Sequence, residues 1–166
     1  MSAIISPCGQ YRYRLERQSA GPGATAVIMV NPSAADAEQD DATIRKLRGF
    51  GERHHWGTII VGNLFAYRAT DIRDLRTARD PIGPDNDDHL IQILADADQV
   101  IVAWGPLAKQ PRGHANRFIN VLSLIEGACL DPHSIGAPAQ DGHPRHPLML
   151  AYSSPIQPWE FPHATR

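Results

Sequence analysis

The chain has 166 residues, of which 42% are apolar and 20% charged, and its formal net charge at pH 7 is -2. This length fits one domain with one core, and the balance excludes a disordered chain or a fibre. Sixteen basic against eighteen acidic residues provide no global basic field. The charge balance therefore argues against tight, non-specific duplex binding, although a nucleic-acid substrate stays open.

The cysteines and the N-terminal segment indicate the compartment. Cys8 and Cys129 lie far apart and match no zinc or disulfide spacing, so we expect reduced thiols and neither a cofactor nor a bound metal. The first residues lack the basic and apolar regions of a signal peptide, and no segment approaches the ~20 apolar residues of a membrane span. The sequence predicts a soluble, cytoplasmic protein.

The first expected elements are two strands. Residues 10–18 alternate as in a half-buried strand, with apolar positions on one face and Arg12, Arg14 and Glu16 on the other. Residues 25–30 form a continuous apolar run, which is typical of a strand covered on both faces in a parallel sheet.

Helices and strands then alternate along the chain. Asp40 or Asp41 is expected to cap a helix that runs to about Arg53. Residues 85–97 predict a second helix with an acidic first turn, and residues 107–127 a third that Pro111 and Gly113 should break. Further strands are predicted at residues 58–62, 99–103 and 147–151, the last after a polar loop.

Strands separated by helices imply right-handed crossovers and a mainly parallel sheet with helices on both faces. The predicted fold is a three-layer α/β/α sandwich with a four-stranded central sheet and one N-terminal antiparallel strand. We expect a single domain, with an N-terminal strand and turn at residues 1–24, an α/β core at 25–156 and an irregular tail at 157–166.

Polar and aromatic residues follow three of these strands where each strand stops. They are Asn31-Pro32-Ser33, Asn63 and Trp104-Gly105. Ligands of open parallel sheets bind outside the carboxyl ends of the strands. An amide that both donates and accepts suits the edge of a nucleobase, and Phe65 or Tyr67 is placed to stack on it. The pattern favours a pocket for a planar heterocycle.

Each of these residues also has an ordinary structural interpretation. Asn31, which precedes a proline, is a candidate for an Asx turn. Asn63 is a candidate loop cap, and Trp104 a candidate core residue. The functional interpretation depends on their shared location at successive strand ends.

Most of the chain resembles a bacterial and phage family known as domain of unknown function 1643. The matching segments are residues 30–36, 40–45, 63–71, 80–86, 103–105 and 142–148. This resemblance implies no activity.

A second resemblance, to the uracil-DNA glycosylase superfamily, rests on short motifs in the same order along the chain. Asn31-Pro32 is similar to the Asn-Pro motif of mismatch-type members, which implies that Asn31 positions the attacking water. Asn63 is similar to the strand-two Asn that reads the uracil edge. Residues 101–105 are similar to a Leu-Trp-Gly segment on strand three. The resemblance implies a uracil-DNA glycosylase-like fold.

At the predicted fourth strand the chain departs from that superfamily. Residues 151–156 stand where the superfamily has Ala-His-Pro-Ser-Pro-Leu, so Tyr152 replaces the His that stabilises the departing base. That role then falls to Tyr152, Ser153 or a loop histidine, His143 or His146. The two histidines precede the predicted strand, so its polarity places them at the opposite edge unless the loop folds over.

Ser33 adds a hydroxyl, Asp36 a carboxylate that can activate water, and Arg68 a possible phosphate contact. The candidate catalytic residues are Asn31, Ser33, Asp36, His143, His146, Tyr152 and Ser153. The candidate substrate-binding residues are Pro32, Asn63, Phe65, Tyr67, Arg68, Trp104 and Gly105.

Three functions stay open. The first is attack on the N-glycosidic bond of a nucleobase in DNA or a nucleotide. The second is non-catalytic binding of a nucleotide or of single-stranded nucleic acid. The third is metal-dependent phosphoesterase activity built on Asp36, Asp41 and the loop histidines. The expected partners are a nucleobase-containing ligand or single-stranded or flipped-base DNA, and no membrane.

Overall fold

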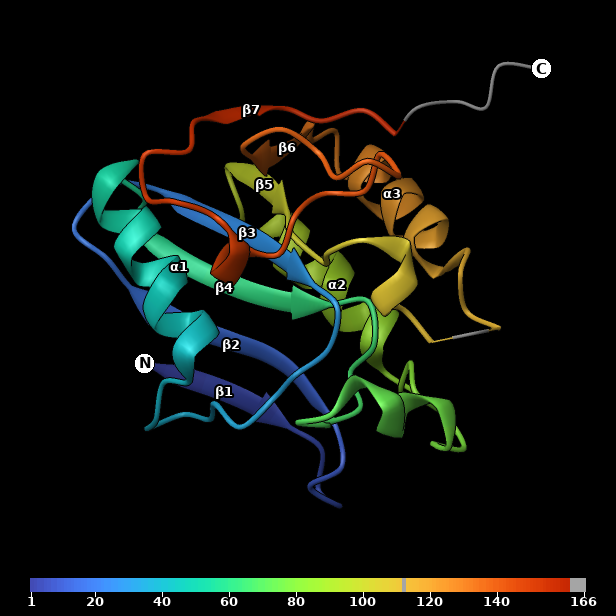
Figure 1. Cartoon of the computed structure of the whole chain (residues 1–166). Coiled ribbons are helices and arrows are strands. Elements are labelled where there is room, and N and C mark those ends of the chain that lie inside the picture. Colours follow the sequence, from blue (N-terminus) through green and yellow to red (C-terminus); the bar gives the residue numbers. More distant parts are fainter. Residues whose placement is uncertain (112, 162–166) are drawn as a thin grey trace.

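A computed structural model describes residues 1–111 and 113–161, which form a seven-stranded sheet between two layers of helices (Figure 1). The strands, in their order across the sheet, are β1 (Ser2–Ile5), β2 (Arg12–Gln18), β4 (Thr58–Asn63), β3 (Ala24–Met29), β5 (Gln99–Val102), β6 (Pro132–Ile135) and β7 (Ile156–Pro158). The central four, β4, β3, β5 and β6, run parallel. On one side β2 pairs antiparallel with β4, and β1 pairs antiparallel with β2; on the other side β7 pairs antiparallel with β6. The α/β class is confirmed, but the predicted number of strands is too low.

The winding of the sheet reverses at β3. The chain passes from β3 to β4 on one side through helix α1 (Ala42–Arg53), and then returns past β3 to β5 through α2 (Asn86–Ala95). Helix α3 (Arg117–Gly127) leads on to β6. Such a switch point opens a crevice outside the carboxyl ends of the strands, where ligands of open α/β sheets bind.

Two apolar cores hold the layers together. Ile44, Leu47 and Phe50 of α1 are buried at helical spacing against one face of the sheet. α2 and α3 cover the other face with residues such as Leu90 and Val121 (Figure 1). In the part of the chain that the structure describes, no helix is both long and apolar enough to cross a membrane.

The predicted helices form, with two differences at their starts. Asp41 caps α1, since its side chain accepts a hydrogen bond from the Ile44 amide at 2.9 Å. Asp85 stands at the cap of α2 without making that bond. The third helix begins at Arg117, because Pro111 and Gly113 interrupt the segment before it; residues 107–109 form the short 3₁₀ helix η2 (Leu107–Lys109). Position 112 of that prediction lies outside the described residues.

The fourth strand does not lie where the sequence predicts it. Residues 147–149 form a 3₁₀ helix, η3 (Pro147–Met149), which the His146 side chain caps. Pro147 has no amide hydrogen for a strand ladder, and Met149 is 77% exposed. The fourth parallel strand is instead β6, which lies inside the predicted polar loop. Its polar residues His133 and Ser134 give the segment the composition of a loop. β7 opens the predicted irregular tail, of which residues 162–166 lie outside the described part.

The predicted alternation along β2 is wrong at its start. Pairing with β1 shifts by one residue and leaves Tyr13 as the extra residue of a bulge. The bulge turns Arg12 toward the α1 side, where its Nη1 donates to the carbonyl of Ala35. Arg14 points to the other side and bonds Asp96 at the end of α2. Arg12 is consequently buried rather than facing outward, with 3% of its surface exposed.

Candidate functional site

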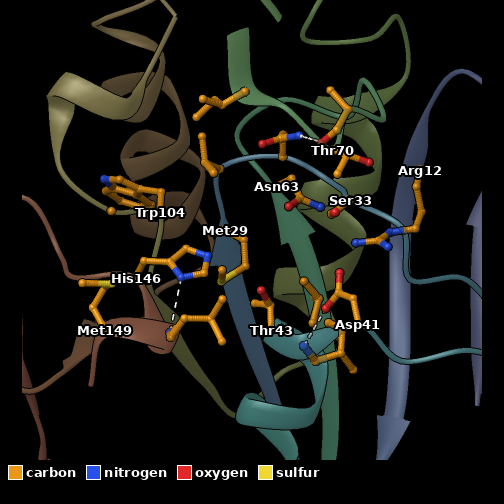
Figure 2. Close-up of a pocket in the computed structure, with 18 of the residues that line it drawn as sticks. Arg12, Met29, Ser33, Asp41, Thr43, Asn63, Thr70, Trp104, His146 and Met149 are labelled. Atoms are coloured by element: carbon orange, nitrogen blue, oxygen red, sulfur yellow. Dashed lines mark hydrogen bonds between the residues drawn. The ribbon is translucent and has the colours of Figure 1, made fainter. Parts of the chain in front are cut away.

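A pocket of about 600 Å³ lies at the carboxyl ends of β3, β4 and β5, at the point where the winding reverses (Figure 2). Its other walls come from the N-terminus of α1, the loop after β4, and η3. Six of the predicted site residues line it: Asn31, Ser33, Asn63, Trp104, Gly105 and His146. The prediction that the strand ends meet at one cavity is therefore correct for the first five of these residues, whereas His146 was expected at the opposite edge.

Asn63 lines the pocket with a side-chain amide that is buried and has no hydrogen-bond partner among the described residues. It ends β4 and is 1% exposed, yet neither its Nδ2 nor its Oδ1 makes a hydrogen bond within the described residues. Its backbone is held by the side chain of Asn86, which donates to the Asn63 carbonyl at 3.0 Å. A buried amide without partners costs about 1–3 kcal/mol. A protein retains such a group where a ligand or water can satisfy it.

Asn31, at the end of β3, is bonded differently. Its Nδ2 donates to the carbonyls of Ala69, at 2.8 Å, and Pro32, at 3.0 Å. These two bonds tie the end of β3 to the loop that follows β4. Its Oδ1 makes no hydrogen bond within the described residues, so Asn31 offers the pocket an acceptor and no donor.

Trp104 forms a wall of the pocket and is fixed from behind by His143. Its indole N–H donates to Nδ1 of His143 at 3.1 Å. Because Nδ1 accepts, the neutral imidazole carries its proton on Nε2, and burial lowers the pKa of His143. The ring packs edge-on against Phe118 at 4.7 Å. His143, predicted as catalytic, therefore does not line the pocket but positions Trp104.

His146 lines the pocket, in contrast to the expectation that strand polarity would place it at the opposite edge (Figure 2). That expectation depended on a strand at 147–151. The true strand, β6, precedes the loop, so the loop returns from the carboxyl edge. Nδ1 of His146 accepts the Leu148 amide at 3.3 Å, which leaves the proton of the neutral ring on Nε2. Burial lowers the pKa of His146, and the carboxylate of Asp41 opposes that shift.

Tyr152 and Ser153 lie away from the pocket. Tyr152 packs on the outer part of α1, with its ring 5.2 Å from that of Phe50 and the Lys46 ammonium 3.8 Å above it. Ser153 follows in the same turn and is exposed. The prediction that Tyr152 replaces a catalytic His depended on a strand at residues 147–151, and the structure has no strand there.

The predicted stacking residues are also elsewhere. Phe65 is fully buried in the core and meets His114 edge-on at 5.7 Å. Tyr67 packs against Tyr11 and faces a separate groove. Pro32 is buried without lining the pocket. Trp104 is the aromatic residue among those that line the pocket, and only 1% of its surface is exposed.

Asp36 and Arg68 flank the pocket without entering it. Oδ1 of Asp36 accepts the amides of Glu38, at 2.9 Å, and Gln39, at 2.8 Å. These bonds lower the pKa of Asp36 and commit its carboxylate to a turn. Arg68 lines the neighbouring groove, which shares Ser33, Ala69 and Thr70 with the pocket.

Two charged residues of the pocket were not predicted as part of this site. Arg12 lines it, and burial lowers the pKa of Arg12 to about 10. Its alternating strand assigned it to the outer face, so the sequence held no signal for this position. Asp41, predicted as a helix cap or metal ligand, lines the pocket from the N-terminus of α1 (Figure 2). Across residues 1–111 and 113–161, no three His, Cys, Asp or Glu side chains come together to hold a metal ion.

The fold and the site define a mixed α/β protein with a pocket at a topological switch point, lined mostly by apolar residues and by a few polar ones. Residues 12–148 match the family described as "Protein of unknown function (DUF1643)", and the chain belongs to that family. The matched segment contains every residue that lines the pocket except Met149. No curated protein and no solved structure matches the chain.

Proposed function

We propose that this protein binds a nucleobase in the strand-end pocket and cleaves its N-glycosidic bond, in DNA or in a nucleotide. The unpaired amide of Asn63 is the observation that carries the proposal. An amide presents one donor beside one acceptor, and a base edge such as the imide of uracil presents the matching pair. A base that entered the pocket would satisfy both atoms of Asn63 at once and offset the cost of burying them.

The wall of the pocket suits a flat ligand. Trp104 lines the pocket although it is 1% exposed, and the bond to His143 holds its indole in one orientation. Gly105 follows with a φ of 84°, a conformation that glycine adopts without strain. A Cβ added at Gly105 would lie 3.6 Å from Cβ of His146, so the glycine is needed here for its backbone conformation beside Trp104.

In the proposed reaction, a water molecule attacks the sugar carbon, the bond from that carbon to the base nitrogen breaks, and the base leaves with the electron pair. Oδ1 of Asn31 orients the water by accepting one of its hydrogens. The Asp41 carboxylate takes up the proton that the water loses. Nε2–H of His146 donates to the oxygen of the departing base and stabilises its negative charge.

The relocation of His146 also strengthens the resemblance to the uracil-DNA glycosylase superfamily. His146-Pro147-Leu148 follows the fourth parallel strand and reaches the pocket. It stands in for the His-Pro segment that the superfamily carries after its own fourth strand. Together with Asn31-Pro32, Asn63 and Trp104-Gly105, it supports a glycosylase-like fold and site.

Non-catalytic binding of single-stranded nucleic acid is the alternative, and the rim of the pocket favours a polymer. Leu148 and Met149 line the pocket and are 47% and 77% exposed. Apolar side chains at such a rim stack on neighbouring bases or fill the space that a displaced base leaves. A metal-dependent phosphoesterase has no comparable support, because no three metal-ligating side chains come together among the described residues.

The test is the release of free base from oligonucleotides and nucleotides that contain uracil, a mismatched thymine or a modified base, measured by chromatography. Asn63→Leu and His146→Asn should abolish release. His55→Asn is the matched control, because His55 is exposed and has a φ of 56° that Asn readily adopts. Binding without release would favour the alternative. If the protein neither binds nor releases any base, the proposal is refuted.

A further inference from the structure

The pocket continues toward two arginines that the proposed reaction does not use. Arg12 lines the pocket from β2, and Arg68 lines the adjoining groove. The two cavities share Ser33, Ala69 and Thr70, so the arginines lie on either side of this short partition. Arg68 is close enough to Arg12 to lower its pKa by charge repulsion.

Each guanidinium has unused donors. Nη1 of Arg12 donates to Ala35, but its Nε is buried and makes no hydrogen bond within the described residues. Nη1 of Arg68 donates to the carbonyl of Gly9 at 3.2 Å, and its Nε is likewise buried without a partner there. Figure 2 shows the Arg12 guanidinium directed into the pocket between Ser33 and Asp41.

Among the described residues no carboxylate forms a direct ion pair with either arginine, although Asp41 and Asp36 lie close enough to raise the pKa of Arg12 against the effect of burial. Oδ1 of Asp41 caps α1, and Asp41 makes no ion pair with Arg12 within 4.0 Å. Asp36 is held by two backbone amides. Arg17, another nearby cation, is paired with Asp40. A charge buried without an ion-pair partner is costly, and a bound anion would remove that cost.

We infer that Arg12 and Arg68, with the hydroxyls of Ser33 and Thr70 between them, form a subsite for the phosphate of a nucleotide whose base lies against Asn63. This inference rests on the proposed function for the base, but the phosphate subsite can be tested separately. Guanidiniums bind phosphate through paired hydrogen bonds. The substrate class is therefore a nucleoside with a phosphate ester, and a bare nucleobase or nucleoside is a poor ligand.

The experiment compares calorimetric binding of deoxyuridine, thymidine, deoxycytidine, deoxyadenosine and deoxyguanosine with that of their 5′-monophosphates. The phosphate should raise affinity about tenfold or more, and added salt should reduce this gain. Arg68→Met should abolish the gain. Arg53→Met, at the far end of α1, is the matched control and should retain it. Equal binding of nucleoside and nucleotide, or an undiminished gain in Arg68→Met, would overturn the subsite.

Because Arg12→Met is liable to misfold, Arg12→Lys serves as the second variant. It retains the charge but loses the fork of donors, and the gain from the phosphate should fall severalfold. A gain equal to that of the wild type would contradict a role for Arg12. If a trinucleotide shows the same gain in affinity over the nucleoside as the monophosphate does, the bound phosphate belongs to a polymer. If only the monophosphate shows the gain, the ligand is a free nucleotide.

Inorganic pyrophosphate separates failure of the subsite from failure of the proposed function. Suppose that no nucleoside or nucleotide binds. If pyrophosphate then raises the melting temperature of the wild type but not that of Arg68→Met, the phosphate subsite is supported although the base pocket is not. Absence of that shift would remove the subsite as well. If nucleosides bind and the phosphate adds nothing, the base pocket survives and the subsite does not.

Discussion

The ends of β3 and β4 carry the same residue in two different states. Asn31 and Asn63 each follow a buried strand, and the two strands are parallel neighbours in the sheet. The amide nitrogen of Asn31 donates to two carbonyls and fastens the loop after β4. The amide of Asn63 is more deeply buried and has no partner within the described residues. One asparagine therefore builds the pocket, and the other is available to a ligand.

This difference distinguishes two roles that a polar residue at the end of a strand can have. A polar residue there either satisfies the backbone where a strand stops or meets a ligand in the crevice. Burial alone does not distinguish them, because both side chains are largely covered. The count of satisfied donors and acceptors does, and it predicts opposite responses to the same substitution.

The largest expected effect is loss of ligand binding in Asn63→Leu. Two hydrogen bonds to a base, each of about 1.5 kcal/mol, correspond to a loss of about 100-fold in affinity. The free energy of unfolding should stay unchanged or rise, because the substitution removes an unpaired buried amide. Calorimetry and urea unfolding of the same sample measure both. A destabilised variant that binds normally would invert the roles of the two asparagines.

Asn31→Leu should show the opposite pattern. It leaves the carbonyls of Ala69 and Pro32 without their donor, which lowers the free energy of unfolding by about 1–3 kcal/mol. For a chain of this size, each kcal/mol lowers the melting temperature by about 2–4 °C. Thermal unfolding beside Asn63→Leu makes the comparison direct. Equal melting temperatures for the two variants would show that the bonds of Asn31 do not hold the loop.

The sequence places Asn63 and α1 well, for reasons that are local. The apolar run of β4 is short and bounded, so its end is visible. Asp41 precedes apolar residues at helical spacing and does cap α1. What the sequence does not contain is the partner count of Asn63, which depends on the loops that pack around it.

Two errors have distinct physical causes. The apolar run from Pro147 imitates a strand, whereas β6 contains His133 and Ser134 and resembles a loop. Misplacing that strand reverses the apparent polarity of the segment and moves His146 to the wrong edge. Arg12 is misplaced because a single bulge residue changes which side chains face the α1 layer, and alternation along a strand cannot reveal a bulge.

The end of β5 gives a third case, because the indole N–H of Trp104 is bonded to His143 and this bond fixes the orientation of the ring. His143→Phe retains a ring of similar size but leaves the indole N–H without an acceptor. We expect a loss of about 1 kcal/mol in unfolding free energy and a severalfold loss of ligand affinity. Calorimetry and urea unfolding report both values. Unchanged affinity in a destabilised variant would limit His143 to a structural role.

The smallest expected effect concerns pH. Burial lowers the pKa of both His143 and His146, so the unfolded chain binds protons more readily than the folded one. Stability is therefore fully present above the ordinary histidine pKa of about 6.5 and falls as pH drops below it. Urea midpoints at pH 8 and pH 5.5 measure this loss. It should be smaller in His146→Asn than in the wild type, and unchanged in His55→Asn; the reverse order would contradict the assignment.

The most direct test of the account is the nuclear magnetic resonance signal of the Asn63 side-chain amide, assigned by its absence in Asn63→Leu. Titration with the five deoxynucleoside monophosphates should shift this amide pair strongly for at least one base. The Asn31 amide, assigned through Asn31→Leu, should move little because its donors are already bonded. If no base shifts the Asn63 signal, or if both amides respond alike, Asn63 does not read a nucleobase.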